Sequence, residues 1–550
     1  MKKIKYYLFL FLAAGITSCS LHEDLVDVPT PGQIRTESDV KTLIAGSYSF
    51  LSSSPAFKFQ GMSMLVLCAD DIYSPGAGDF TAYANRTYDG NNTAPFWNQL
   101  FFTIGNANNL IDAMDRLNLD AAFERRVYGE AYFLRAFAYY YLVRLYGGVP
   151  LRTESLQIDS QFYLPRNTVD EVYAQIFKDF KAAAERLPLQ TAVSVDETGR
   201  ATKGAAQAIL AQAYLTYGNK LALKGGSGTA HYQQASLYAD SVINSGAYSL
   251  LDNYADLFDV GKENGAYREV IFGVRFSRDN QRTGQNSKGS EFASRFGVSQ
   301  ITNTSGGDNT GALRPMHWFF DYYNNSPEYK GDYRIERTFV SRGLNVPQNK
   351  YFVTYPNIPS GTDGTIATPV LAKYQDPQGK DARNNENDFF VIRLAEVYLI
   401  KAEAENELNG PTTAAYTAFN QVRTRARKAN GTARTIPANL AAGLSKSQFR
   451  MKVFDERGLE LTGEGQRWFD LVRMQSPVNA AQTMFEYQFL TVLPAKPKVL
   501  PTYMAAQRKW SNTDAVYADA LKVTVRHLLF PVPSVELLQN PAFGPQNPGW

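Results

Sequence analysis

The stretch FLRAFAYYYLVRLYGG, residues 133 to 148, has the apolar spacing of one face of an α-helix. Its stripe comprises Leu134, Phe137, Ala138, Tyr141, Leu142 and Leu145. Gly147 and Gly148 follow as a helix C-cap, and Pro150 prevents continuation because proline lacks a backbone N–H. The stretch therefore predicts an amphipathic helix that ends at these glycines.

Two further stretches repeat this pattern, GAAQAILAQAYLTYG at residues 204–218 and FFVIRLAEVYLIKAEAENELNGP at residues 389–411. We predict that their helices end at Gly218 and Gly410, and that the second apolar stripe begins at Val391. A second amphipathic segment follows each of them, and the segment IGNANNLIDAMDRL precedes the first stretch. Small residues on these stripes are typical of the helix pairs in tetratricopeptide repeats.

Long insertions separate the helix pairs, so the chain is not a regular solenoid. The insertions at residues 70–97 and 277–390 are rich in Gly, Asn, Asp, Ser and aromatic residues. We predict a mainly α fold in which tetratricopeptide-like helix pairs form a scaffold and long irregular insertions carry short strands. Loops of this kind on a rigid scaffold commonly carry functional residues.

The N-terminus, MKKIKYYLFLFLAAGITSCS, has the layout of an export signal: three lysines, an apolar run and small residues before Cys19. The run Ile16-Thr17-Ser18-Cys19 resembles a bacterial lipobox, in which the cysteine after the cleavage site is lipidated. We predict a lipoprotein signal peptide at 1–18, a tether at 19–40 anchored to the membrane by lipid on Cys19, and a single domain at 41–550. The alternative is an ordinary secretory signal with an accidental cysteine.

Charge and cysteine content exclude several classes of function. The formal net charge is +3, and removal of Lys2, Lys3 and Lys5 with the signal leaves the chain near neutral, so nothing indicates nucleic-acid binding. Cys68 is the only cysteine besides Cys19, so no intramolecular disulfide is expected in the folded part.

The sequence gives no specific reason to propose an enzyme, a metal or a cofactor. Its histidines are scattered at His22, His231, His317 and His527, without the spacing of metal ligands. Phosphate-binding loops, nucleophile elbows and calcium loops are missing from the sequence. We therefore predict no catalytic residues and no cofactor.

One stretch, DERGLELTGEGQRWFDL at residues 455–471, places five carboxylates and two arginines in seventeen residues. Glu456, Arg457 and Glu460 are spaced for pairing along one helix, and glycines at 463 and 465 end that helix. A second helix would then begin at Arg467. Because arginines alternate with the acids, we interpret the stretch as a structural ion-pair corner and not as an active site.

The segments RAFAYYYLVRLYGGVPL, RLAEVYLIKAEAENELNG, ERGLELTGEGQRWFDLVR and LFPVPSVELLQNPAFGPQNPGW, with the lipobox, resemble the SusD/RagB family in content and order. Proteins of this family are surface lipoproteins that capture nutrients for Bacteroidetes. The resemblance implies one domain, with helix pairs on one side and ligand-binding insertions on the other. It also implies a partner, a SusC-like TonB-dependent outer-membrane transporter, which the helical face would contact. Glu23 and Asp24 resemble a surface-export signal, which implies an exterior, outer-membrane location.

Two stretches combine aromatic rings, which pack on sugar faces, with polar side chains that bind hydroxyls: residues 84–99 and 313–325. From them we predict the ligand-binding residues Arg86, Tyr88, Trp97, Asn98, Trp318 and Tyr322. The alternative is that these aromatic side chains pack in the core, and Trp97 in particular is placed to be the first core residue of a helix.

The predicted function is capture of oligosaccharides or polysaccharides at the cell surface and their delivery to the transporter, without catalysis. The main alternative is peptide capture, which is associated with the RagB branch of the family. A lipid-anchored hydrolase and a purely structural scaffold are further alternatives.

Overall fold

The computed structural model describes residues 32, 34–76, 79–157, 161–278, 288–303, 309–379, 381–495, 501–511 and 523–550. The predicted signal peptide, Cys19 and most of the predicted tether lie outside these residues. The α-helices are α2 Glu37–Leu51, α3 Gln60–Leu67, α4 Asp79–Asn85, α5 Gly90–Arg116, α6 Ala121–Tyr146, α7 Val169–Arg186, α8 Lys203–Leu223, α9 Thr229–Ile243, α10 Glu263–Ala266, α11 Phe292–Phe296, α12 His317–Asn325, α13 Tyr333–Thr338, α14 Leu394–Asn409, α15 Thr413–Ala426, α16 Lys446–Glu460, α17 Arg467–Arg473, α18 Met484–Tyr487 and α19 Ser534–Gln539.

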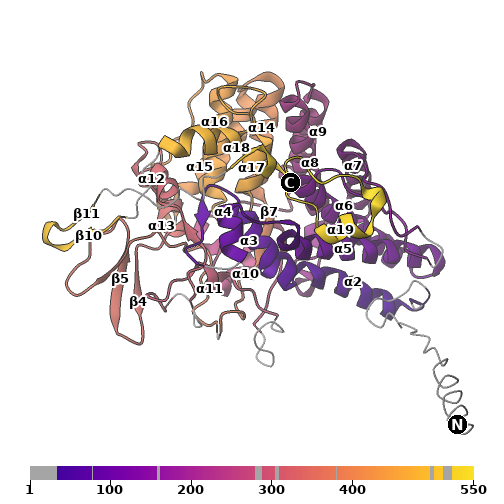
Figure 1. Ribbon diagram of the computed structural model, residues 1–550, viewed down its shortest axis with the longest axis horizontal. Helices are drawn as coiled ribbons and strands as arrows, with labels where there is room; N and C mark the ends of the chain where they lie inside the picture. The colour runs from indigo at the N-terminus through magenta and orange to yellow at the C-terminus, as the bar shows by residue number, and fades with distance from the viewer. Residues whose placement is uncertain are drawn as a thin grey trace, which may run out of the picture.

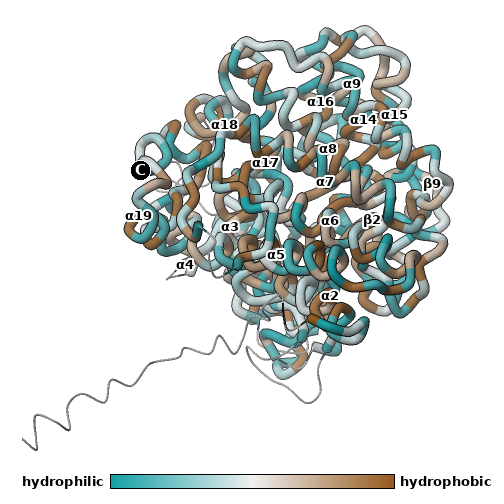
Figure 2. Tube along the Cα trace, turned by 90° about the vertical axis from the view of Figure 1, so that its right-hand side faces the viewer, coloured by the Kyte–Doolittle hydropathy of each residue, from teal (hydrophilic) through white to brown (hydrophobic). Residues whose placement is uncertain are grey.

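The long helices pack in an order that follows the chain. Helix α2 packs on α5, and each helix from α5 to α9 packs on the next. Helix α14, which follows the long insertion, packs on α9, and α15 and α16 then pack on α14. Figures 1 and 2 show these helices gathered on one side of the molecule. The predicted scaffold of helix pairs is confirmed.

Helix α6 ends before Gly147, as its sequence predicts, but it begins at Ala121 and every residue from Phe133 to Tyr146 is buried, so the predicted amphipathic stripe is wrong for this part of the helix. Helix α14 ends before Gly410 as predicted, whereas the end of α8 and the start of α14 differ from prediction. Asp120 caps the start of α6, and Gly147 follows its last residue with a φ of +78°. Helix α8, however, continues through Gly218 to Leu223. A Cβ at Gly218 would lie 2.7 Å from the ring of Tyr232, so this glycine allows α9 to approach α8 and does not end the helix.

The third stretch contains both a strand and a helix. Phe389–Arg393 is strand β7, and α14 begins only at Leu394, so the predicted start of the helical stripe at Val391 is wrong. All five strand residues are buried, and a short fully buried apolar run has no period that distinguishes strand from helix. Strand β7 pairs antiparallel with β2 (Val270–Val274) beneath the helices.

The insertion at 277–390 places β4 (Arg342–Asn345), β5 (Lys350–Thr354), α12 and α13 at the opposite side of the molecule from α5–α9 (Figure 1). The insertion at 70–97 forms β1 (Ile72–Tyr73), α4 and the start of α5. The strands of the insertions are short: β1 pairs with β3 (Arg314–Pro315), which is distant in sequence, and β4 pairs with β5, which pairs with β6 (Gly364–Ile366). Among the described residues, two short hairpins lie outside the insertions: β8 Lys428–Ala429 with β9 Thr432–Ala433, and β10 Tyr503–Met504 with β11 Lys509–Trp510.

The packed part of the chain begins before the predicted domain boundary at residue 41. Ile34 and Val40 are buried against α5 and α6, in a cluster that includes Leu110 and Val127. Thr36 caps α2 and makes a reciprocal pair of hydrogen bonds with Asp39. Within the described residues, the helices are too short or too polar to span a bilayer.

Candidate functional site

The acidic stretch at residues 455–471 forms the end of α16, a turn and α17, and its charged groups are buried in ion pairs. Glu456 pairs with Arg334 at 2.7 Å and Arg423 at 2.8 Å. Glu460 pairs with Arg334, Arg393 and Arg425. The interpretation of this stretch as an ion-pair corner is confirmed.

The partners of these groups differ from those that the spacing predicts. Arg457 pairs with Glu396 of α14 and Asp470 of α17, at 2.8 and 2.7 Å, in place of the predicted pairing with Glu460. Within α17, Asp470 pairs with Arg473 at 2.8 Å. Periodicity identifies neighbours on one helix, but it contains no information about the arginines that other helices bring to the same place.

The ion pairs around Glu460 join into one cluster with equal numbers of positive and negative side chains. Six cations and six anions are linked: Arg334, Lys373, Arg393, Arg423, Arg425 and Lys452 with Glu269, Glu328, Asp332, Glu456, Glu460 and Glu464. Burial alone would raise the pKa of Glu460, but the guanidinium groups of Arg425, Arg393 and Arg334 hold it well below its usual range. A general acid at neutral pH requires a raised pKa, so Glu460 is not one.

Most of the ligand residues predicted from 84–99 lie in the core. Arg86, Tyr88 and Trp97 are 2%, 2% and 1% exposed. The Arg86 guanidinium donates to the carbonyl oxygens of Cys68, Ala69 and Ala84 and lies over the ring of Phe489. Trp97 is a core residue of α5, as the alternative interpretation expects. We therefore leave these three residues out of the candidate site; Asn98 is exposed on α5.

Helix α12 brings the other two predicted residues to the surface. Its inward face consists of His317, Phe319, Phe320 and Tyr323, all buried. Trp318, Asp321 and Tyr322 are spaced i, i+3, i+4 on the other face. Trp318 and Asp321 are half-buried and Tyr322 is 39% exposed.

Three more aromatic rings extend this face. The phenol of Tyr355 donates to the Asp321 carboxylate at 3.1 Å. The ring of Trp510 lies 5.5 Å from that of Tyr355 and 5.4 Å from that of Tyr503. Tyr503 and Trp510 are directly opposite in the β10–β11 pair, so they share one face of it. All three rings are half-buried.

We call these residues the aromatic surface: Trp318, Asp321, Tyr322, Tyr355, Tyr503 and Trp510. Burial raises the pKa of Asp321 to about 6, although the Tyr355 hydrogen bond lowers it. Within the described residues, no ion pair involves Asp321. The surface therefore combines flat rings with a carboxylate that accepts hydrogen bonds.

Sequence analysis missed Tyr355, Tyr503 and Trp510. Tyr355 and Trp510 are more than 150 residues apart in the chain, and no local pattern brings them together. A half-buried tryptophan next to turn-forming residues is a weak signal by itself, because isolated exposed aromatic side chains are common.

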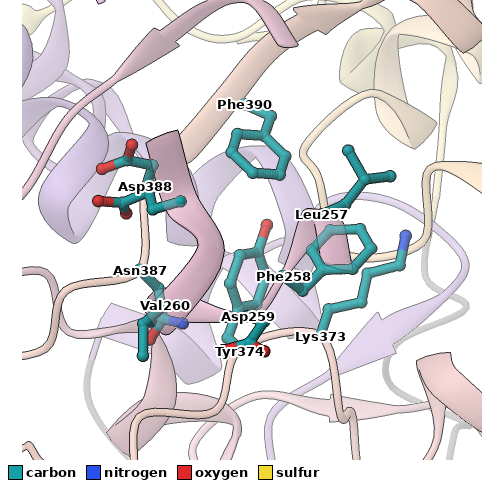
Figure 3. A pocket seen from close by; sticks show the side chains of 10 residues that line it. Leu257, Phe258, Asp259, Val260, Lys373, Tyr374, Asn387, Asp388 and Phe390 are labelled. Atoms are coloured by element: carbon teal, nitrogen blue, oxygen red, sulfur yellow. The ribbon is translucent and has the colours of Figure 1, made fainter. Parts of the chain in front are cut away.

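Among the described residues, a cavity of about 790 Å³ is lined by residues 523–527, Pro548 and Gly549, and two other cavities are smaller. Figure 3 shows a pocket lined by Phe258, Lys373, Tyr374, Asp388 and Phe390 among others, with a volume of about 10 Å³, room for one water. The other, of about 240 Å³, lies between α2, residues 196–200 and β2, where its arginines Arg200 and Arg275 are already ion-paired. In the described part of the chain, no three His, Cys, Asp or Glu side chains are arranged to hold a metal ion.

The structure thus defines a helical scaffold protein that presents an aromatic surface on its insertions. The family model described as the SusD family matches residues 268–550, more than half of the chain, and the protein belongs to this family. A second model, described as "Starch-binding associating with outer membrane", matches residues 33–215.

Relatives share sequence with the chain, and solved structures share its fold. The chain is 28% identical to a SusD-like protein of Formosa agariphila over the full length of both. It is 25% identical to the starch-binding protein SusD of Bacteroides thetaiotaomicron, over 62% of this chain and 63% of that one. A crystal structure of a SusD homolog from the same species superposes with a TM-score of 0.75 at 22% identity, covering 93% of this chain and 97% of the other. A laminarin-binding SusD-like protein gives a TM-score of 0.68 at 22% identity, covering 94% and 100%.

Proposed function

We propose that this protein is a lipid-anchored protein of the outer membrane that captures an oligosaccharide on its aromatic surface at the cell exterior. It then passes the ligand to a SusC-like TonB-dependent transporter, without making or breaking a bond. The observation that carries the proposal is the grouping of Trp318, Asp321, Tyr355 and Trp510 at one solvent-facing site. Sugar rings have apolar C–H faces that pack on flat aromatic rings, and their hydroxyls donate to carboxylates.

The comparisons support a carbohydrate as the ligand class. One relative is named a starch-binding protein, and one similar structure is that of a laminarin-binding protein. The matching of residues 33–215 to a family associated with the outer membrane supports the location. The lipobox at Cys19 supports the lipid anchor.

The arrangement of carboxylates supports binding without hydrolysis. Glycosidases generally place two carboxyl groups on either side of the bond that they cleave. Two carboxylates accept hydrogen bonds from the described residues of the aromatic surface: Asp321, which is half-buried, and Asp455, which is buried and accepts the Tyr322 hydroxyl. Of these two bonded carboxylates, a sugar on the surface would reach Asp321 alone, which supports binding without a catalytic pair.

Isothermal titration tests the proposal. Soluble protein that begins after Cys19 is titrated with maltoheptaose, laminarihexaose and a mixed peptide pool, and the sugars are recovered and sized. We expect heat from an oligosaccharide, loss of that heat in Trp318→Ala and Trp510→Ala, and recovery of the sugar at its original length. The matched control is Phe162→Ala, because Phe162 is an aromatic residue 62% exposed on a different loop.

Each other outcome contradicts a part of the proposal. Heat from peptides alone would replace the ligand class with peptides. If no ligand gives heat of binding, the proposal of ligand capture is contradicted and a structural scaffold role remains. If the recovered sugar is shorter than the sugar added, the protein is a hydrolase. Loss of heat in Phe162→Ala, with binding retained in Trp318→Ala, would move the site away from the aromatic surface.

A further inference from the structure

Buried polar groups hold the outward-facing Trp318 and Tyr322 side chains of α12 in place. The indole N–H of Trp318 donates to the carbonyl oxygen of Asp70 at 2.8 Å. The hydroxyl of Tyr322 donates to the carboxylate of Asp455 at 2.7 Å. On the inner face of the helix, the hydroxyl of Tyr323 donates to the carbonyl oxygen of Asp455 at 2.8 Å.

One arginine of α17 connects these two anchor points. Arg467 donates to both carboxylate oxygens of Asp70, at 2.7 and 3.0 Å. It also donates to the carbonyl oxygen of Phe454, the residue before Asp455, at 3.3 Å, and its guanidinium lies 3.8 Å from the Phe454 ring. A paired, planar guanidinium of this kind fixes its partners in both distance and orientation.

A glycine in α16 makes room for this connection. A Cβ at Gly458 would lie 2.3 Å from the Tyr323 hydroxyl and 3.0 Å from the nearest guanidinium nitrogen of Arg467. Helix α16 therefore approaches α12 and α17 closely only because residue 458 has no side chain. Asp455, Gly458 and Arg467 all belong to the acidic stretch at 455–471.

We infer that Arg467 and Asp455 are positioning residues for ligand binding: they fix the Trp318 and Tyr322 side chains in place before the sugar arrives. The inference rests on the proposed function, because it assigns a role toward the same surface. Binding sites gain affinity when supporting residues hold the contact groups in their bound geometry, since less conformational entropy is then lost on binding. The ion-pair corner thus contributes to recognition as well as to stability.

The experiment compares two arginines of α17 that differ in what they touch. Arg473 is a matched control because it is as buried as Arg467: the two residues are 6% and 7% exposed. Arg473 also donates to both carboxylate oxygens of one acid, but that acid is Glu403 of the scaffold helix α14. Arg467→Lys and Arg473→Lys keep the charge and lose the two-point geometry. We expect Arg467→Lys to weaken binding of the oligosaccharide probe, maltoheptaose or laminarihexaose, by about tenfold, and Arg473→Lys to leave it unchanged.

A double-mutant cycle separates positioning from a general loss of structure. Tyr322→Phe and Asp455→Ala should each weaken binding of the same probe by about three- to tenfold, because each removes one hydrogen bond. The double variant should bind no more weakly than either single variant, since both remove the same interaction. Additive losses would overturn the role of Asp455.

Hydrogen exchange gives a readout that does not depend on any sugar. Backbone amides of residues 317–325 should exchange faster in Arg467→Lys than in the parent protein, and at the parent rate in Arg473→Lys. Equal exchange of this peptide in both variants would overturn the inference even if the protein binds glycan. Faster exchange in Arg467→Lys alone, with no binding by the parent protein, would support the positioning of α12 and refute the proposed function.

Discussion

Replacing Arg393 with methionine would remove the cation at the centre of the ion-pair cluster. Arg393 is 1% exposed and touches three carboxylates. Its guanidinium donates to Glu464 at 2.8 and 3.0 Å, to Glu269 at 3.1 Å and to Glu460 at 2.5 Å. Methionine fills a similar volume without charge, so the variant mainly tests electrostatics.

The magnitude follows from the balance of charge in the cluster. The six linked cations and six linked anions become five cations and six anions, which leaves one buried negative charge uncompensated. Breaking a buried ion pair by removing one partner costs about 3–5 kcal/mol. Adding Glu464→Gln restores the balance, so the double variant should be more stable than the sum of the two single losses by at least about 1 kcal/mol.

Urea unfolding at pH 7, followed by tryptophan fluorescence, measures these free energies. The control is Glu37→Gln, which breaks an exposed pair with Lys41 and should leave the midpoint unchanged. A loss below about 1 kcal/mol in Arg393→Met, or strict additivity with Glu464→Gln, would refute the reasoning that these charges compensate one another in the interior.

Four further predictions concern three residues, Asp321, Gly218 and Cys68. Burial raises the pKa of Asp321 to about 6, so its ionised carboxylate destabilises the fold at pH 7. Asp321→Asn should therefore raise the free energy of unfolding at pH 7 by about 1–3 kcal/mol. This gain should vanish below about pH 4, because the carboxyl group is then protonated in the unfolded protein as well. The same carboxylate should make oligosaccharide affinity fall about tenfold or more as pH drops through 6, and titration calorimetry at pH 5 and 7.5 checks this; a flat profile would exclude Asp321 from binding. Gly218→Ala should lower the urea midpoint, since a contact of 2.7 Å with the Tyr232 ring costs about 1–3 kcal/mol and outweighs the helix propensity gained; a stabilised variant would contradict this. Cys68 is buried and its pKa is raised to about 12, so a thiol reagent should modify it only after unfolding; rapid labelling of native protein would contradict the burial.

The sequence predicts the scaffold well because helix pairs are a local property. The apolar spacing from Leu134 to Leu145 indicates a helix without knowledge of what packs against it. The predictions fail where the local structure depends on which part of the chain packs against the residue. Gly218 resembles the end of a helix in the sequence, but in the structure it lies inside α8 and leaves room for the ring of Tyr232. Val391 fits the apolar spacing of the following helix, but it lies in strand β7.

The site was harder to predict because aromatic residues are common both in cores and on ligand surfaces. Trp97 and Trp318 have similar sequence surroundings, yet Trp97 is 1% exposed and Trp318 is half-buried beside solvent. The difference depends on which helix face meets the rest of the fold. Tyr355 and Trp510 join the site through tertiary contacts that no spacing rule contains.

A crystal structure of the protein soaked with the oligosaccharide that binds in titration tests the central claim most directly. We predict a sugar ring packed on Trp318 or Trp510, with a hydroxyl bonded to the Asp321 carboxylate and all glycosidic bonds intact. Sugar bound elsewhere, such as on helices α7–α9, or a cleaved product in the site, would contradict the account.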